Sequence, residues 1–314
     1  MKKPFDFVGK RRMCLIISAC ILGVALLFNI IFGTEMDISF KGGTLIRYTY
    51  EGTVDVNVVK DTAQEVLGKD LSAKIETVNN TKVVTISLSD EVSADSLKKL
   101  DDTMAKTFKD NKVEQFSSNS LAASMGRRFF IKCLVALILA ALLLLVYVGL
   151  RFRRIGGLSA GAFALFALVH DLLFVYFTFV VFRIPLNDNF VAVMLTILGY
   201  SLNDTIVIYD RIRENRKKMD VKTSISEIVN MSLNQSFVRT CNTTISTAIA
   251  AATITVVALV LRMDAIISFA LPMLFGVLSG FYSSVFLSSP LWAAWIEHKE
   301  AKAASGSAKS KKKR

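Results

Sequence analysis

The chain has 314 residues, of which 53% are hydrophobic, and a mean hydropathy of +0.47. It is more apolar than a typical soluble domain, and its apolar residues come in runs of about 20, the length that a helix needs to cross a bilayer. The formal net charge is +12, but the basic residues stand beside the apolar runs, as they do at the cytoplasmic ends of membrane spans, which disfavours a nucleic-acid-binding protein. An RNA-binding C-terminal tail remains as the alternative.

Six apolar runs predict six transmembrane helices. The first run follows basic residues, as a signal peptide would, but it is longer than a typical signal core and no clear small-residue cleavage site follows it, so we expect a retained span. The positive-inside rule places residues 1–12 and the basic tail 297–314 in the cytoplasm, with Arg127 and Arg128 as the exception. Within that tail, residues 301–314 are expected to be disordered. The predicted spans cover residues 13–33, 129–150, 156–182, 189–210, 240–261 and 265–296.

Residues 34–126 lack a long apolar run and carry mixed, slightly acidic charge, which predicts a small folded domain outside the membrane. Alternation of apolar and polar residues predicts the strands, and Asn79-Asn80 is the expected hairpin turn between the second and the third. The resulting order is βαββαβ, the ferredoxin-like α+β pattern. The predicted strands are 44–50, 71–78, 82–88 and 112–116, and the predicted helices are 54–67 and 93–109.

Near its end, the fourth span carries an ionisable residue at a depth where the hydrocarbon core disfavours a charge. Asp204 lies about 22 Å along this span, and Ser201 and Thr205 share its helical face, while Asn203 precedes it in the sequence. An ionised side chain at the bilayer centre costs about 2.5–3.5 kcal/mol on insertion scales. Two interpretations stay open for Asp204: a functional carboxylate, which we favour, and a hydrogen bond between packed helices.

A polar stripe precedes and enters the fifth span. With about 100° between successive residues, its members share an arc of about 100°, so we expect them to face a partner helix or a wet cavity and not lipid. The alternative for Arg239 is that it lies near the inner boundary and extends its charge to water. The stripe consists of Gln235, Arg239, Asn242, Thr243 and Ser246.

Two further features lie in the third and sixth spans. His170 and Asp171 stand midway along the third span, either as a proton-relay pair or as a structural pair between helices, and the sequence leaves both open. In the sixth span Gly276 and Gly280 form a GxxxG, which Ser284 continues, so we expect close helix packing on that face.

Nothing in the sequence predicts a soluble enzyme or a metal site. It contains no HExxH, GxSxG or P-loop motif and no metal-spaced cluster of cysteine and histidine. The four cysteines lie in or beside apolar runs, so we expect them to be small apolar fillers. We therefore expect no cofactor.

Several motifs together resemble the SecF members of the SecD/SecF family. They are "GYSLNDT" and "YDRIRE" at 199–214, "HD" at 170–171, "LNQSFVRT" at 233–240, "GFYSSVFLSSPL" at 280–291 and "DISFKGGT" at 37–44. In the last of these, Lys41 stands where the family more usually has a small residue. The resemblance covers nearly the whole chain.

The resemblance implies a subunit that pairs with SecD in the bacterial cytoplasmic membrane, in a fold similar to that of resistance-nodulation-division transporters. It also implies that the subunit acts together with the SecYEG channel and the SecA ATPase. A proton gradient would help to draw an unfolded preprotein outward late in export, and ATP would be hydrolysed by a separate partner. Asp204 and Arg239 match the positions at which the family passes protons. Two alternatives remain: half of a small-molecule or lipid exporter of the same fold group, and a scaffold without a proton path.

Overall fold

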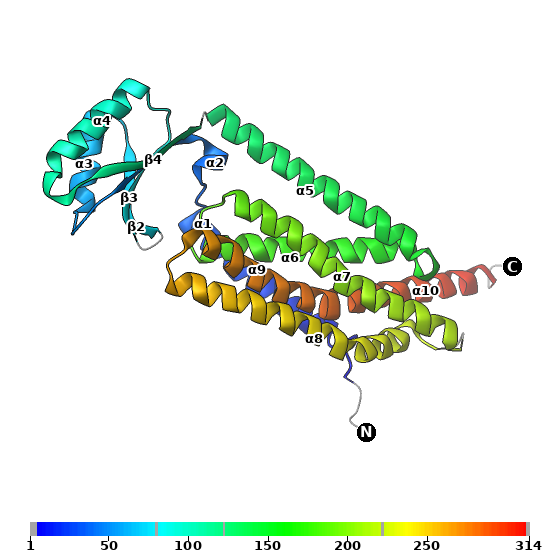
Figure 1. Ribbon diagram of the computed structural model, residues 1–314. Coiled ribbons are helices and arrows are strands. Elements are labelled where there is room, and N and C mark those ends of the chain that lie inside the picture. The colour runs from blue at the N-terminus through cyan, green and yellow to red at the C-terminus, as the bar shows by residue number, and fades with distance from the viewer. Residues whose placement is uncertain (1–4, 79–80, 122, 221–222, 312–314) are drawn as a thin grey trace.

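The computed structural model describes residues 5–78, 81–121, 123–220 and 223–311. Long helices form a bundle, and a small α+β domain projects from one end of it (Figure 1). Among these residues, six stretches are long and apolar enough to cross a membrane. The bundle helices are α1 (Arg11–Phe32), α5 (Ala123–Arg151), α6 (Gly157–Val181), α7 (Asp188–Lys218), α8 (Ile225–Val260), α9 (Asp264–Tyr282) and α10 (Ser289–Lys311).

Several helices extend beyond the predicted spans: α5 begins at Ala123 instead of 129, and α7 continues past residue 210 to Lys218. The run 240–261 is only the second half of α8, which begins at Ile225, where the Ser224 side chain accepts the N–H of Glu227. The sixth span is divided, because a π-helical segment (Ser283–Ser288) joins α9 to α10. The prediction of a disordered tail is wrong as far as Lys311, since α10 continues through residues rich in the helix formers Ala and Lys; residues 312–314 lie outside the described part.

The α+β domain has the predicted βαββαβ order. It consists of β1 (Gly43–Thr49), α3 (Val56–Leu67), β2 (Leu71–Val78), β3 (Thr81–Leu88), α4 (Ala94–Thr107) and β4 (Glu114–Leu121), with a short 3₁₀ turn (Lys109–Asn111) before β4. The sheet order is β2-β3-β1-β4, and each neighbouring pair is antiparallel. Both helices supply the core against the sheet, through Val59 and Ala63 of α3 and Leu100 and Met104 of α4.

The last strand lies later in the chain than predicted, at Glu114–Leu121 instead of 112–116. Its second half is polar and does not alternate, so only its antiparallel pairing with β1 makes it a strand. The predicted hairpin turn at Asn79-Asn80 lies outside the described residues.

A short linker ties the domain to the bundle. The N–H of Asp37 donates to the carbonyl of Leu186 in the loop between α6 and α7, at 2.9 Å. Asp37 also caps the short helix α2 (Ile38–Lys41), which buries Phe40 against Phe129 and Phe130 of α5. The "DISFKGGT" motif is therefore the joint between domain and membrane bundle.

Gly43 in this joint should tolerate no side chain. Its φ is +128°, and a Cβ there would lie 2.1 Å from the carbonyl oxygen of Leu88. Because both backbone strain and a clash with main-chain atoms oppose the change, Gly43→Ala should lower the free energy of unfolding by more than about 1 kcal/mol. Thermal unfolding of the purified protein in detergent measures this. Gly23→Ala, where a Cβ meets nothing within 4 Å, is the control, and equal stability of the two variants would contradict the prediction.

The segment before α1 is folded against the bundle. The side-chain amide of Asn234 holds Phe5 in both directions, since the Phe5 N–H donates to Asn234 Oδ1 (3.0 Å) and Asn234 Nδ2 donates to the Phe5 carbonyl (2.9 Å). One turn earlier, Asn230 accepts the N–H of Val8 (3.0 Å) and donates to Asp6 (2.8 Å). Hydrogen bonds from the Gly9 N–H and the Asn230 amide lower the pKa of Asp6. Ionised Asp6 therefore contributes fully to holding this segment at pH values above the ordinary pKa of aspartate, and this contribution is lost as the pH falls through the lowered pKa.

Asn234→Ala should release this segment. The variant loses both bonds to Phe5, and trypsin should then cleave at Lys10 and Arg11 several-fold faster, because the protease needs an extended chain. Mass spectrometry of timed digests measures the cleavage. Ser246→Ala on the same helix is the control, since that hydroxyl bonds only to its own helix at Asn242. Unchanged cleavage would show that the bonds from Asn230 and the apolar contacts hold the segment without Asn234.

Candidate functional site

Asp171 is the centre of a hydrogen-bonded cluster between α6, α7 and α9. Its side chain is fully buried, at 0% exposure. Ser201 donates to Oδ2 at 2.6 Å, and Ser283, at the start of the π segment, donates to the same oxygen at 2.7 Å. Ser279 donates to Oδ1 at 2.7 Å, and His170 Nδ1 lies 3.1 Å from that oxygen. One carboxylate thus joins three helical elements.

A column of hydroxyl groups continues from this cluster toward the end of the bundle that carries the chain termini. Thr205 and Ser284 share a hydrogen bond of 2.9 Å, and Ser284 also donates to the carbonyl of Ser201 at 3.2 Å. One turn further on, the Tyr209 hydroxyl lies 2.9 Å from that of Ser288. Successive turns of α7 therefore face successive serines of the sixth span.

Within the described part of the chain, Asp204 makes no hydrogen bond to this column. Its side chain is 2% exposed, and Oδ2 has no hydrogen-bond partner among the described residues. The predicted neighbours divide: Ser201 and Thr205 enter the hydroxyl column, whereas Asn203 is exposed. Asp204 is thus a buried carboxyl with an unused oxygen atom.

The predicted polar stripe of α8 lies on the outer surface of this chain. Gln235, Arg239, Asn242, Thr243 and Ser246 are all exposed, and the buried polar residues of α8 are Ser232, Ser236, Thr240, Thr244 and Thr255. The hydroxyls of Thr243 and Ser246 donate to carbonyl groups one turn back in the same helix, which reduces the cost of exposing them to an apolar medium.

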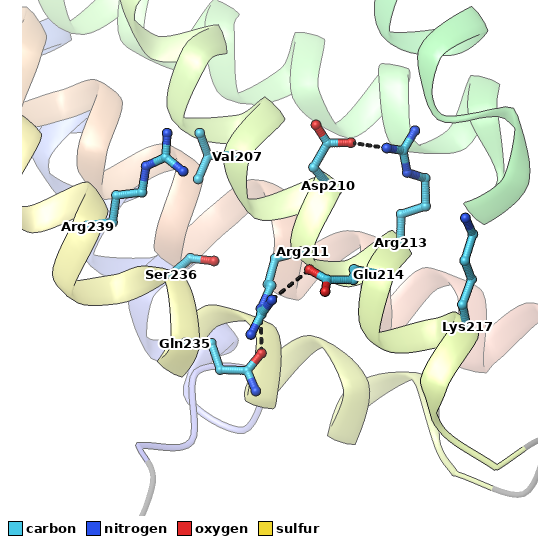
Figure 2. Close-up of a pocket in the computed structure, with 9 residues that line it drawn as sticks. All are labelled: Val207, Asp210, Arg211, Arg213, Glu214, Lys217, Gln235, Ser236 and Arg239. Atoms are coloured by element: carbon cyan, nitrogen blue, oxygen red, sulfur yellow. Dashed lines mark hydrogen bonds and ion pairs between the residues drawn. The ribbon is translucent and has the colours of Figure 1, made fainter.

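A cavity of about 570 Å³ lies between the ends of α7 and α8. Figure 2 shows Arg239 extending from α8 toward Val207 of α7, with no dashed contact to the other residues drawn. Ion pairs join Arg211 to Glu214 (2.6 Å) and Arg213 to Asp210 (2.8 Å). The lining residues are Val207, Asp210, Arg211, Arg213, Glu214, Lys217, Gln235, Ser236 and Arg239. Within the described part of the chain, Arg239 forms no ion pair with Asp204.

The glycines of the sixth span lie against α7, on the side where packing was predicted. A Cβ on Gly276 would lie 2.7 Å from Ile197 side-chain atoms, and one on Gly280 would lie 3.0 Å from the Ser201 Cβ. This close approach brings the sixth-span serines within reach of α6 and α7.

Sequence reasoning did not find Ser279, Ser283, Ser288 or Tyr209 as members of the site. Ser279 and Ser283 are four residues apart and share a helical face, which was an available signal. The π segment that turns Ser283 and Ser284 inward together has no signal in a 3.6-residue period.

Comparison with known proteins agrees with this architecture. Residues 99–298 match the family described as protein export membrane protein SecD/SecF, C-terminal. The protein translocase subunit SecF of Alicyclobacillus acidocaldarius is 30% identical over 310 residues, covering 98% of this chain and 97% of the relative. SecF of Sebaldella termitidis is 32% identical over 259 residues, covering 82% and 81%.

Fused relatives match as well, over a part of their length. The translocase subunit SecDF of Bacillus subtilis is 29% identical over 303 residues, and the alignment covers 93% of this chain and 38% of that protein. The crystal structure of SecDF from Thermus thermophilus aligns with a TM-score of 0.78 at 26% identity, over 94% of this chain and 39% of that chain. Because the family match covers more than half of the chain and a SecF relative matches it end to end at 30% identity, this chain belongs to the SecD/SecF family of protein export membrane proteins.

Proposed function

We propose that this chain is the SecF-type subunit of a SecD–SecF complex that uses the proton motive force to assist late stages of Sec-dependent protein export. The name of the Bacillus subtilis relative joins SecD and SecF in one protein, which supports a SecD partner. The family resemblance adds SecYEG, SecA and the translocating preprotein as further partners. The basic clusters beside the spans support a cytoplasmic location for both termini and a location outside for the α+β domain.

One observation carries the proton-driven part of this proposal: Asp204 is buried in a membrane-spanning helix and keeps one oxygen without a hydrogen-bond partner. A carboxyl in that place is costly to ionise, and a purely structural carboxyl would be expected to use both oxygens. An unused oxygen is where a proton can be taken up and released.

Arg239 supplies the second charge. It stands on the neighbouring helix and its side chain is exposed on this chain. If α7 and α8 shift relative to each other, or SecD covers the polar stripe of α8, the guanidinium can approach the ionised Asp204 and leave the protonated one. Proton uptake is then coupled to helix position, and each proton crossing supplies about 2.3 kcal/mol per 100 mV.

The domain outside the membrane can follow such a shift. β4 leads into α5 within a few residues, and the linker at Asp37 is bonded to the loop between α6 and α7. The domain therefore has two attachments to the bundle, and a rearrangement of the helices would move it as a rigid body.

The test is export into membrane vesicles that contain this chain with its matching SecD, with and without a proton gradient. The gradient should speed the late stage of export, and vesicles without this chain should lose that gain. An equal gain in vesicles without it would overturn the proposal.

A scaffold subunit without a proton path is the second candidate. It is favoured by one observation, the lack of an ion pair between Asp204 and Arg239 in the described part of the chain. It predicts that neutralising either residue leaves the gradient effect intact.

A further inference from the structure

The side chain of Asp171 uses both of its oxygen atoms. The hydroxyls of Ser201 and Ser283 bond to Oδ2, the hydroxyl of Ser279 bonds to Oδ1, and His170 Nδ1 lies 3.1 Å from Oδ1. Because the three serines belong to α7, α9 and the π segment, this one carboxyl connects all of these elements to α6.

Asp171 and Asp204 thus differ in kind, although both are buried in adjacent membrane-spanning helices. Both oxygens of Asp171 are engaged, by two contacts each, whereas Asp204 Oδ2 is free of partners among the described residues. The first carboxyl is held by its neighbours, and the second has an oxygen atom left available for proton exchange.

The contacts of Ser201 connect the two carboxyls. Its hydroxyl donates to Asp171, and its carbonyl accepts the hydroxyl of Ser284 from the sixth span. Asp204 follows Ser201 by three residues, less than one helical turn. A rotation of α7 that moves Asp204 therefore also moves Ser201 relative to Asp171.

We propose that Asp171 is a positioning residue for the proton site: its carboxyl holds α7 and the sixth span to α6 through Ser201, Ser279 and Ser283, and so sets the orientation of Asp204. The proposal rests on the proposed function, because it needs Asp204 to exchange protons. His170 is the side chain beside Asp171 that can carry a positive charge. From the other elements, the ring of Tyr282 lies 6.2 Å from that of His170 and its hydroxyl donates to the carbonyl of Cys14 on α1.

The test uses a hydrophobic carbodiimide, which reacts with protonated carboxyl groups in apolar surroundings, on the complex with SecD. Peptide mass spectrometry follows the labelling of Asp204 as the pH is varied. In the unaltered protein, labelling of Asp204 should rise as the pH falls.

Variants then test the positioning. Asp171→Asn should change the rate of Asp204 labelling at fixed pH by about threefold or more, because asparagine cannot make the same set of bonds to Ser201, Ser279 and Ser283. If that variant does not assemble, Ser279→Ala removes a single donor and should change the rate in a folded protein. Thr196→Ala is the matched control on α7, since that hydroxyl bonds to its own helix at Ala192.

The outcomes separate the two proposals. An unchanged labelling rate in an assembled Asp171→Asn or Ser279→Ala complex overturns the positioning role and leaves the proposed function standing. If Asp204 in the unaltered protein shows no pH-dependent labelling, the proposed function itself fails, and the positioning role fails with it.

Discussion

Asp204→Asn should abolish the part of export that depends on the proton gradient while leaving the complex with SecD assembled. Asparagine has nearly the same shape but binds no proton, so the site can no longer alternate between two charge states. Each proton at about 100 mV supplies about 2.3 kcal/mol, which corresponds to at most about a 50-fold effect on rate. The measurement is late-stage preprotein export in vesicles with and without the gradient.

Two further variants define the controls. Asp210→Asn changes a carboxyl two turns further along α7 that is already paired with Arg151 and Arg213, so its effect should be small. Arg239→Met removes the second charge and should have the same phenotype as Asp204→Asn. If Asp204→Asn prevents assembly, the residue is structural; if export keeps its gradient response, the proton path lies in the partner.

The membrane part of the fold could be predicted because the thickness of the bilayer sets the length of the apolar runs that span it. Runs of about 20 apolar residues have no other common explanation, and they mark the six spanning helices. Where the helix leaves the apolar region this signal ends: α8 begins 15 residues before its apolar run, at a Ser224 cap, in a polar sequence. The extent of β4 was hidden for a similar reason, since pairing with β1 and not its own pattern makes its second half a strand.

The site could be predicted only in part. Asp204 was found because an ionisable group in the hydrocarbon has a high cost whatever surrounds it. The role of Asp171 could not be decided, because its donors Ser279 and Ser283 are more than 100 residues away in the sequence and serine is common in membrane helices. The polar stripe of α8 is exposed on this chain, so the expectation that it faces a partner helix or a wet cavity stays a prediction, because the sequence of one chain does not say what covers its surface.

Gly276→Ala should destabilise the bundle although it adds a single methyl group. The new Cβ would lie 2.7 Å from two side-chain atoms of Ile197 and 2.9 Å from Val175. Both neighbours are completely buried, so neither can move without disturbing the helices behind it. Overpacking of this kind costs about 1–3 kcal/mol, and thermal unfolding in detergent measures it.

The double variant Gly276→Ala with Ile197→Ala separates a clash from other effects of the substitution. Ile197→Ala alone should destabilise by leaving a cavity, but it removes the two nearest atoms that the new Cβ would meet and leaves the Val175 contact, so the two changes should cost less together than the sum of each alone. Gly199→Ala, where a Cβ meets nothing within 4 Å, is the control for replacing glycine in a membrane-spanning helix. Strict additivity would show that Ile197 accommodates the methyl group and that close packing at Gly276 does not hold the sixth span against α7.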